Sequence, residues 1–223
     1  PESWTIDLEA LEIAIIKYKP KALISVDIYG QSCDYDAINI LCKKYNVFLI
    51  EDSAEALGSM YKEKKCGSFG DISILSFNGN KIITTSGGGM LLSKNIEYVK
   101  KAKFLASQAK EKAPYYEHKE LGYNYRLSNI LAAIGCGQIE RINRFISNRR
   151  NIFKQYFQAL SKIEPLNFME ETTGTFSNRW LSTLTIDPKK TNITNLDVIK
   201  ALSEENIESR LLWKPMHLQP LYK

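Results

Sequence analysis

The chain has 223 residues, of which 44% are hydrophobic and 25% are charged, and its formal net charge is +5. This composition is ordinary for a globular protein, and no apolar run approaches the roughly 20 residues of a membrane-spanning helix. The four cysteines are widely spread without a C-x-x-C pair, and there are only two histidines. These features disfavour a zinc site, a disulfide framework or a His-rich metal site, so we expect no metal, and a reducing cytoplasm fits the cysteine usage.

Two further features of composition concern partners and processing. The densest basic segment, residues 141–154, has five basic and no acidic residues. We interpret it as a solvated helix face rather than as a nucleic-acid or other polyanion site. The chain opens with Pro1 instead of an initiator methionine, so we expect an N-terminus that has been cut or processed.

The first half of the chain alternates helical and strand patterns. Residues 5–18 have apolar side chains at helical spacing, with Thr5 or Asp7 near the expected start. A short apolar strand is expected at 22–27 and a second helix at 34–46. Residues 47–52 (VFLIED) are apolar until their last two positions, which is typical of a parallel strand buried on both faces.

Two more strands are expected at 72–77 and 89–93, separated by the polar, turn-rich segment NGNKIITTSGG. The β-α-β succession indicates an α/β fold with a parallel sheet. Ligands of such sheets bind beyond the carboxyl ends of the strands. Asp52 and Ser76 both lie at such ends, so the chemistry of the protein is expected there.

The second half of the chain is different in character. Residues 127–160 contain no proline and predict a nearly continuous helix. A short strand over 179–186 and a helix near 195–205 follow. We therefore divide the chain into 1–140, part of a large domain, and 141–223, a linking helix with an incomplete, smaller α+β domain.

The segments EDSAEALGS (51–59) and CGSFGDISILSFNGNKIITTSGGGM (66–90) hold the candidate chemistry. An enzyme that uses pyridoxal 5'-phosphate (PLP) needs a lysine to hold the cofactor and a carboxylate to keep its pyridine nitrogen protonated. Lys81, in a turn after a strand, and Asp52, at a strand end, are these two candidates. Taken singly, each has a simpler interpretation, because loop lysines are usually solvated and an aspartate after a strand usually caps a turn.

The joint pattern of EDSAEALG, GSFGD and SFNGNK followed by TTSGGGM resembles the DegT/StrS-type family of nucleotide-sugar aminotransferases. The resemblance extends upstream to PKALISVDIYGQSCDYDAI, downstream to LGYNYRLSNILAAIGCGQIERI, and so over nearly the whole chain. SNRWLST (177–183) and ESRLLWKPMHLQPLY (208–222) are similar to bacterial UDP-4-keto-sugar 4-aminotransferases of glycan biosynthesis. The resemblance implies the type I fold of PLP-dependent transferases, with flanking helices around the sheet of the large domain.

The resemblance also implies roles for single residues. Lys81 would be the Schiff-base lysine and would move the proton during amino transfer. Asp52 would pair with the pyridine nitrogen. The other implied cofactor contacts are Ala54 at the ring face, Glu55 near the ring hydroxyl, Ser76 at the phosphate, and Asn124 reaching that phosphate from the other subunit of a homodimer. Arg126 and His217 are candidates to bind the diphosphate of the substrate.

The implied reaction moves an amino group from an amino acid, expected to be glutamate, to C4 of a UDP-linked 4-keto-6-deoxy sugar. Family members that dehydrate sugars instead have histidine in place of the lysine, and Lys81 argues against that branch. The family's phosphate-binding Gly-Thr/Ser turn and its ring-stacking aromatic do not occur in these 223 residues, so we expect weaker PLP binding here than in a longer parent. Two alternatives stay open: a non-catalytic, transaminase-like dimerisation module, and a nucleotide-binding α/β protein without PLP.

Overall fold

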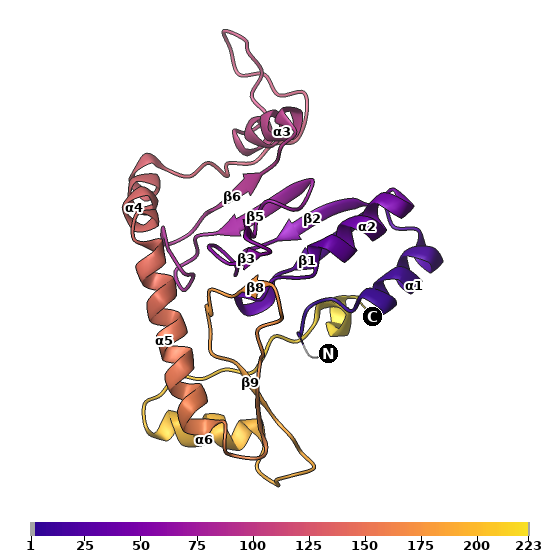
Figure 1. The fold of residues 1–223 in the computed structure, drawn as a ribbon. Coiled ribbons are helices and arrows are strands. Elements are labelled where there is room, and N and C mark those ends of the chain that lie inside the picture. Colours follow the sequence, from indigo (N-terminus) through magenta and orange to yellow (C-terminus); the bar gives the residue numbers. More distant parts are fainter. Residues whose placement is uncertain (1–2, 223) are drawn as a thin grey trace. The chain divides into compact units, whose positions relative to one another are not determined.

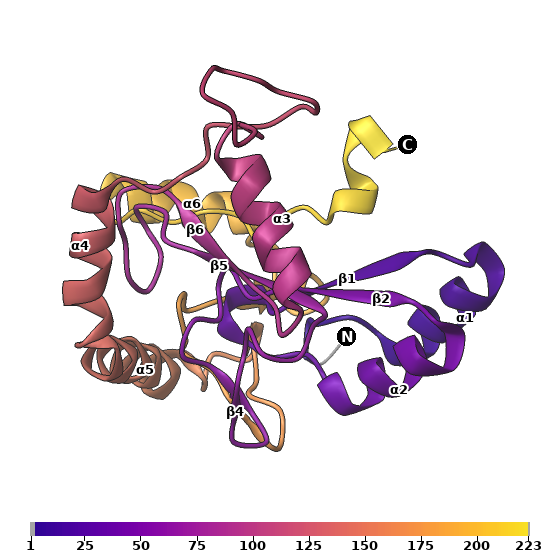
Figure 2. The same ribbon diagram turned by 90° about the horizontal axis from the view of Figure 1, so that it is seen from above.

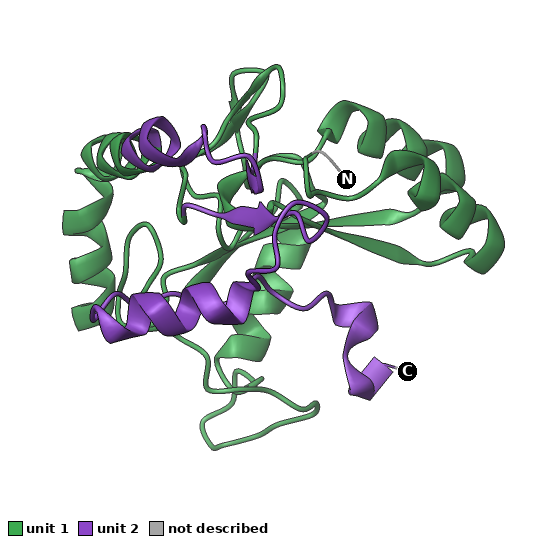
Figure 3. Ribbon diagram, turned by 90° about the horizontal axis from the view of Figure 1, so that it is seen from below, with its two compact units in different colours: residues 1–153, 170–181 green, residues 154–169, 182–223 purple. Residues whose placement is uncertain are grey.

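The structure is a computed structural model, and it describes residues 3–222. The chain forms two compact units: residues 1–153 with 170–181, and residues 154–169 with 182–223 (Figure 3). No helix in the described range 3–222 combines the length and apolarity needed to cross a membrane. The domain boundary that the sequence suggested near residue 140 stays a prediction.

The first unit is built around a four-stranded sheet. Its strands are β1 (Ala22–Val26), β2 (Phe48–Asp52), β5 (Ile72–Ser76) and β6 (Gly89–Leu92), in the order β1-β2-β5-β6 (Figure 1). β1, β2 and β5 run parallel, as the sequence predicted. The expectation of a wholly parallel sheet was wrong, because β6 pairs antiparallel with β5. A turn-rich connection without a helix returns the chain directly alongside β5.

Helices α1 (Leu8–Tyr18) and α2 (Tyr35–Tyr45) cover one face of this sheet. Both begin where a side chain caps the first turn: Asp7 accepts from the Ala10 N–H and Asp34 from the Ala37 N–H. Buried side chains of the two helices form one hydrophobic core with others from β2, the adjoining loops and the segment after β2: Leu11, Ile15, Cys33, Tyr35, Ile38, Cys42, Val47, Leu49 and Tyr61.

The two faces of the sheet differ in burial. Leu49 and Glu51 of β2 point to the α1–α2 side and are fully buried. Phe48 and Asp52 alternate to the opposite face, where Phe48 meets Tyr98 of α3 (Ile96–Ala106) at 5.6 Å between ring centroids. Burial of β2 on both faces was therefore a wrong expectation. Asp52 lies on the more open face, where a ligand has room.

A second, small sheet joins two distant parts of the first unit. Its strands are β3 (Met60–Tyr61), β4 (Lys64–Lys65) and β8 (Thr175–Phe176), in the order β4-β3-β8. Met60 pairs antiparallel with Phe176. This pairing places the segment after β8 next to the loop that follows β2.

The helical stretch after residue 127 is interrupted. It forms α4 (Asn129–Ile139) and α5 (Ile142–Leu160), which run in different directions (Figure 2). The prediction of a nearly continuous helix was wrong at residues 140–141, because the Arg141 N–H donates to the Gln138 carbonyl in a tighter, three-residue turn. Ser128 caps α4 by accepting from the Leu131 N–H.

The second unit contains short elements. β7 (Leu166–Phe168) pairs antiparallel with β9 (Leu184–Ile186), and α6 (Asn195–Glu204) begins at a capping box formed by Thr194 and Asp197. The 3-10 turns η2 (Met216–Leu218) and η3 (Pro220–Tyr222) follow. The strand expected over 179–186 is confined to its last three residues. Arg179 has a φ of 51°, which is incompatible with an extended strand.

Candidate active site

Lys81 lies in the turn that follows β5. The turn is closed by a hydrogen bond of 3.0 Å from the Lys81 N–H to the Asn78 carbonyl. The amine Nζ lies 3.7 Å from Oε1 of Glu55 and 4.0 Å from the ring centroid of Trp180. Only 12% of the Lys81 side chain is exposed. Lys81 is therefore not the solvated loop lysine of the simpler interpretation.

The surroundings of Lys81 change its proton affinity. Burial lowers the pKa of the Lys81 amine, and the opposing attraction of the Glu55 and Asp52 carboxylates is smaller. A lowered pKa increases the fraction of neutral amine, which is the form that attacks a carbonyl carbon. The geometry thus provides a sheltered nucleophilic amine with two carboxylates nearby.

The carboxyl ends of β2 and β5 bring the other predicted residues to this region. Asp52 ends β2 and accepts a hydrogen bond of 3.1 Å from the Ala54 N–H. Ser76 ends β5, and its hydroxyl accepts from the Asn78 N–H at 3.4 Å. Strand register pairs Asp52 with Ile74, two residues before Ser76, so both side chains lie on the same face of the sheet. This placement follows from the strand ends alone.

Glu55 connects Lys81 to a strained turn. Its Oε2 accepts from the Tyr29 N–H at 2.6 Å. Tyr29 lies within the 3-10 turn η1 (Ile28–Gly30), is buried, and has a φ of 53°. Positive φ in a bulky residue is strained and needs support from its surroundings. The Glu55 carboxylate therefore both faces Lys81 and supports this turn.

Glu51 was not among the predicted site residues. Three backbone N–H groups and two hydroxyls lie within hydrogen-bond distance of its buried carboxylate: Gly67, Phe69, Gly70, Ser53 and Ser73. A β-carbon on Gly70 would lie 2.5 Å from the Ile72 carbonyl oxygen, so a larger residue would displace backbone there. The EDSAEALG and GSFGD motifs thus contain a loop anchor beside the candidate catalytic residues.

Asp27 is a second buried carboxylate beside Glu51. The Ser53 hydroxyl lies 2.7 Å from Asp27 Oδ2 and 3.0 Å from Glu51 Oε1, and can donate to only one of them. Burial raises the pKa of Asp27 to about 7, against hydrogen bonds from Cys33, Ser53 and Tyr35. Cys66 completes a group whose potential ligand atoms lie within 4.8 Å of one another. Because N–H and O–H donors already face the carboxylate oxygens, we interpret the group as structural.

The remaining predicted residues lie elsewhere. Asn124 is exposed and forms an isolated β-bridge with Ser107, and Arg126 is also exposed. Within residues 3–222, neither side chain forms a hydrogen bond or an ion pair with Lys81 or Asp52. His217 is an exposed residue of η2 in the second unit. The roles implied for these three residues stay predictions.

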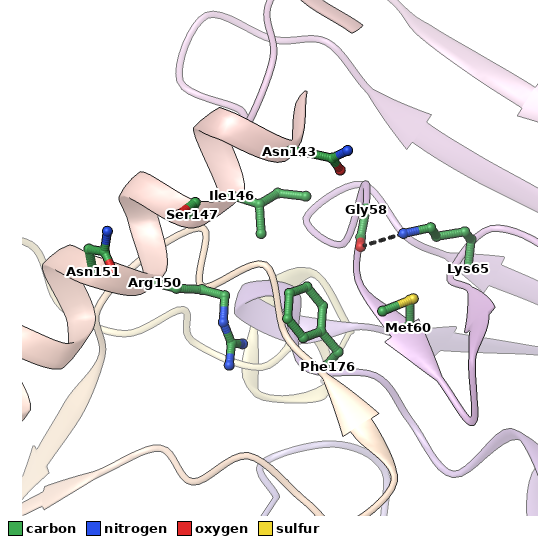
Figure 4. Close-up of a pocket in the computed structure, with 9 residues that line it drawn as sticks. All are labelled: Gly58, Met60, Lys65, Asn143, Ile146, Ser147, Arg150, Asn151 and Phe176. Atoms are coloured by element: carbon green, nitrogen blue, oxygen red, sulfur yellow. Dashed lines mark hydrogen bonds between the residues drawn. The ribbon is translucent and has the colours of Figure 1, made fainter. Parts of the chain in front are cut away.

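A separate hollow in the first unit lies between α5 and the small sheet. It has a volume of about 380 Å³ and is lined by Arg150 and Phe176 among others (Figure 4). The Arg150 guanidinium is already held by Glu171 at 2.7 and 3.1 Å and by the Ser177 carbonyl at 2.6 Å. This network fixes the segment after β8 against α5, and none of the predicted site residues lines the hollow.

A largely buried lysine and a carboxylate at the strand ends of a mainly parallel sheet are typical of PLP-dependent enzymes of the type I fold. Comparison with known proteins is consistent with that class: residues 1–223 match the sequence model of the DegT/DnrJ/EryC1/StrS aminotransferase family. The chain belongs to this family. Its aminotransferases depend on PLP, which is the cofactor that the sequence predicted.

Individual relatives support the assignment. The chain is 50% identical over its full length to EpsN of Bacillus subtilis (strain 168), covering 58% of that protein. It is 36% identical over 98% of its length to a GDP-perosamine synthase of Vibrio cholerae, covering 60% of it. Among solved structures, Helicobacter pylori PseC, an aminotransferase of pseudoaminic acid biosynthesis, aligns with a TM-score of 0.91 at 28% identity, over the full chain and 60% of PseC.

These matches have two consequences. The α/β type I fold expected from the sequence is confirmed. The chain spans about 60% of the length of the relatives it matches. Statements about the activity, substrates and subunits of the whole protein are therefore proposals.

Proposed function

We propose that the protein is a PLP-dependent aminotransferase that moves an amino group from an amino acid, glutamate in the first instance, to C4 of a nucleotide-linked 4-keto-6-deoxy sugar. The observation that carries the proposal is the sheltered amine of Lys81, with Glu55 at 3.7 Å and Asp52 close enough to affect its pKa. A module that only dimerises has no need of such an amine. A nucleotide-binding protein without PLP has no need of such an amine either.

The residues present fit the cofactor. When bound, PLP supplies an aldehyde that condenses with amines and a protonated ring that withdraws electrons from the bond to be broken. Lys81 would hold the aldehyde carbon and would carry the proton of amino transfer on Nζ. Asp52 would hold a proton on the pyridine nitrogen by Coulomb attraction. Ala54, Glu55 and Ser76 would contact the ring face, the ring hydroxyl and the phosphate.

The nucleotide is proposed to be UDP. The support comes from the segments SNRWLST and ESRLLWKPMHLQPLY, which resemble UDP-4-keto-sugar aminotransferases. A GDP-linked sugar is the second candidate, because a GDP-perosamine synthase is 36% identical to this chain. Arg126 and His217 would bind the diphosphate that both candidates share. The product would serve bacterial glycan biosynthesis in the cytoplasm.

The active site is proposed to be shared within a homodimer. The segment around Asn124 exposes several aromatic and aliphatic side chains, including Tyr123 at 44%, Tyr125 at 76% and Leu121 at 77%. Tyrosine and arginine are enriched in subunit interfaces. The neutral amide of Asn124 is a suitable donor to a phosphate oxygen of the partner's cofactor.

The experiment is an amino-transfer assay on the full-length protein with PLP and glutamate. UDP- and GDP-linked 4-keto-6-deoxy sugars are offered separately, and the 4-amino sugar is identified by mass spectrometry. We expect product with the UDP sugar, and none from Lys81→Ala. Product from the GDP sugar alone would replace the nucleotide assignment, and comparable turnover by Lys81→Ala would overturn the proposed function.

Subunit mixing tests the shared site. Lys81→Ala and Asn124→Ala subunits, each inactive alone, are allowed to exchange. A hybrid dimer restores one site that has both Lys81 and Asn124, so part of the activity should return. Demonstrated exchange without any return of activity would remove Asn124 from its proposed role.

A further inference from the structure

Trp180 lies directly against the candidate catalytic lysine, although 99 positions separate the two in the sequence. The indole is 1% exposed, and its ring centroid lies 4.0 Å from Lys81 Nζ. Its Nε1–H donates a hydrogen bond of 2.7 Å to the carbonyl of Asn80, the residue before Lys81. One side chain thus contacts the amine and also holds the backbone that bears it.

Trp180 is itself held by several contacts. Its backbone N–H donates to Asn178 Oδ1 at 2.9 Å, and Tyr29 stacks on the indole at 6.5 Å and 22°. Asn178 Nδ2 donates to the carbonyls of Glu55 at 2.9 Å and Leu57 at 3.0 Å. The segment after β8 is therefore fixed to the loop after β2, and the position of the ring over Lys81 follows from that attachment.

The indole has two opposite effects on the lysine. Its bulk excludes water, which disfavours a charged amine. Its negative π face attracts a cation at this distance, which favours the charged form. The charged groups facing the amine are the carboxylates of Glu55, at 3.7 Å, and Asp52. The smaller apolar side chains of leucine and methionine would retain much of the first effect and lose the second.

We propose that Trp180 is a positioning residue for Lys81: its ring fixes the place of the amine and sets its balance between charged and neutral forms, and its N–H fixes the turn. The importance of this positioning for catalysis rests on the proposed function. Simple core packing is the competing interpretation. The two differ because packing requires only volume, whereas positioning requires an aromatic face.

The test measures Lys81 in the cofactor-free, full-length protein. Lysines are acetylated briefly over a range of pH, and the extent at Lys81 relative to the exposed Lys94 is read by peptide mass spectrometry. The rate at high pH reports access of the reagent, and the midpoint of the profile reports the proton affinity of the amine. Trp180→Leu and Trp180→Met remove the ring, Trp180→Phe keeps a π face, and Trp213→Leu removes an indole elsewhere.

The ringless variants should shift the midpoint to lower pH, with a threefold to tenfold higher ratio of neutral to charged amine at a fixed pH, on the order expected for a lost cation–π contact. Trp180→Phe and Trp213→Leu should keep the wild-type midpoint. Equal midpoints for Trp180→Leu, Trp180→Met and the wild type would overturn the proposal. So would a failure of both ringless variants to fold while Trp180→Phe folds, because volume packing would then explain the residue.

The readout needs neither PLP nor substrate. A failed amino-transfer assay therefore leaves this result unaffected, and a midpoint that does not move leaves the proposed function unaffected.

Discussion

Replacing Glu51 by glutamine tests the loop anchor beneath the candidate active site. Glutamine has nearly the same shape, but one of its two terminal groups is a donor instead of an acceptor. In the structure, Oε2 accepts from Phe69, Gly70 and Ser73, and Oε1 accepts from Gly67 and Ser53. The amide group would therefore replace Oε1, where fewer donors are lost.

The cost can be worked out from these contacts. The Ser53 hydroxyl can turn to donate to Asp27 at 2.7 Å, so only the Gly67 N–H is left facing another donor. One buried donor without an acceptor costs about 1–3 kcal/mol, and the three bonds that remain lose their assistance from a full charge. We expect Glu51→Gln to lower the free energy of unfolding by about 3 kcal/mol.

The assay is urea unfolding followed by circular dichroism, with hydrogen exchange at the Gly67, Phe69 and Gly70 amides as a local readout. Exchange at these amides should become faster in the variant. Glu63→Gln, on the exposed turn between β3 and β4, is the matched control and should change stability by less than about 0.5 kcal/mol. A Glu51→Gln protein as stable as this control, with unchanged exchange, would refute the reasoning.

Three further outcomes follow from the structure. Burial raises the pKa of Asp27 from 3.8 to about 7. The stabilising effect of the protonated Asp27 is therefore fully present below pH 3.8 and is lost as the pH rises through about 7, by at most about 1.4 kcal/mol per pH unit. Asp27→Asn should flatten a pH series of urea midpoints, and an unchanged slope would contradict this. Gly30→Ala should destabilise by more than about 1 kcal/mol in thermal unfolding, because Gly30 has a φ of 89° and its β-carbon would lie 2.0 Å from Asn178 Oδ1, whereas Gly137→Ala, with open space on α4, should be neutral or stabilising. Asp52→Asn should reduce kcat strongly with a smaller change in sugar binding, and wild-type turnover would remove Asp52 from its proposed role.

The residues that local patterns could identify are those at strand ends and helix starts. Asp52 follows an apolar run, and Lys81 follows another with turn residues between, so both could be placed from the sequence alone. Asp7 and Asp34 precede helical patterns and cap them. In each case the signal lies within a few residues of the position that it predicts.

The residues that the sequence did not indicate depend on contacts between distant segments. Trp180 was predicted to lie in a strand. Instead, the φ of Arg179 and the anchoring of Asn178 to the loop after β2 direct the indole onto Lys81. In the sequence, Glu51 is only the neighbour of the candidate Asp52. Its role depends on the loop that folds around its carboxylate. No periodicity or local motif encodes either arrangement.

The central claim is that Lys81 is the residue that holds PLP, and one measurement tests it most directly. The full-length protein is incubated with PLP, reduced with borohydride and digested with trypsin. Modification of Lys81 blocks cleavage there, so a single peptide covering residues 66–94 should carry the phosphopyridoxyl group. Recovery of the label on another lysine, with Lys81 cleaved normally, would contradict the account.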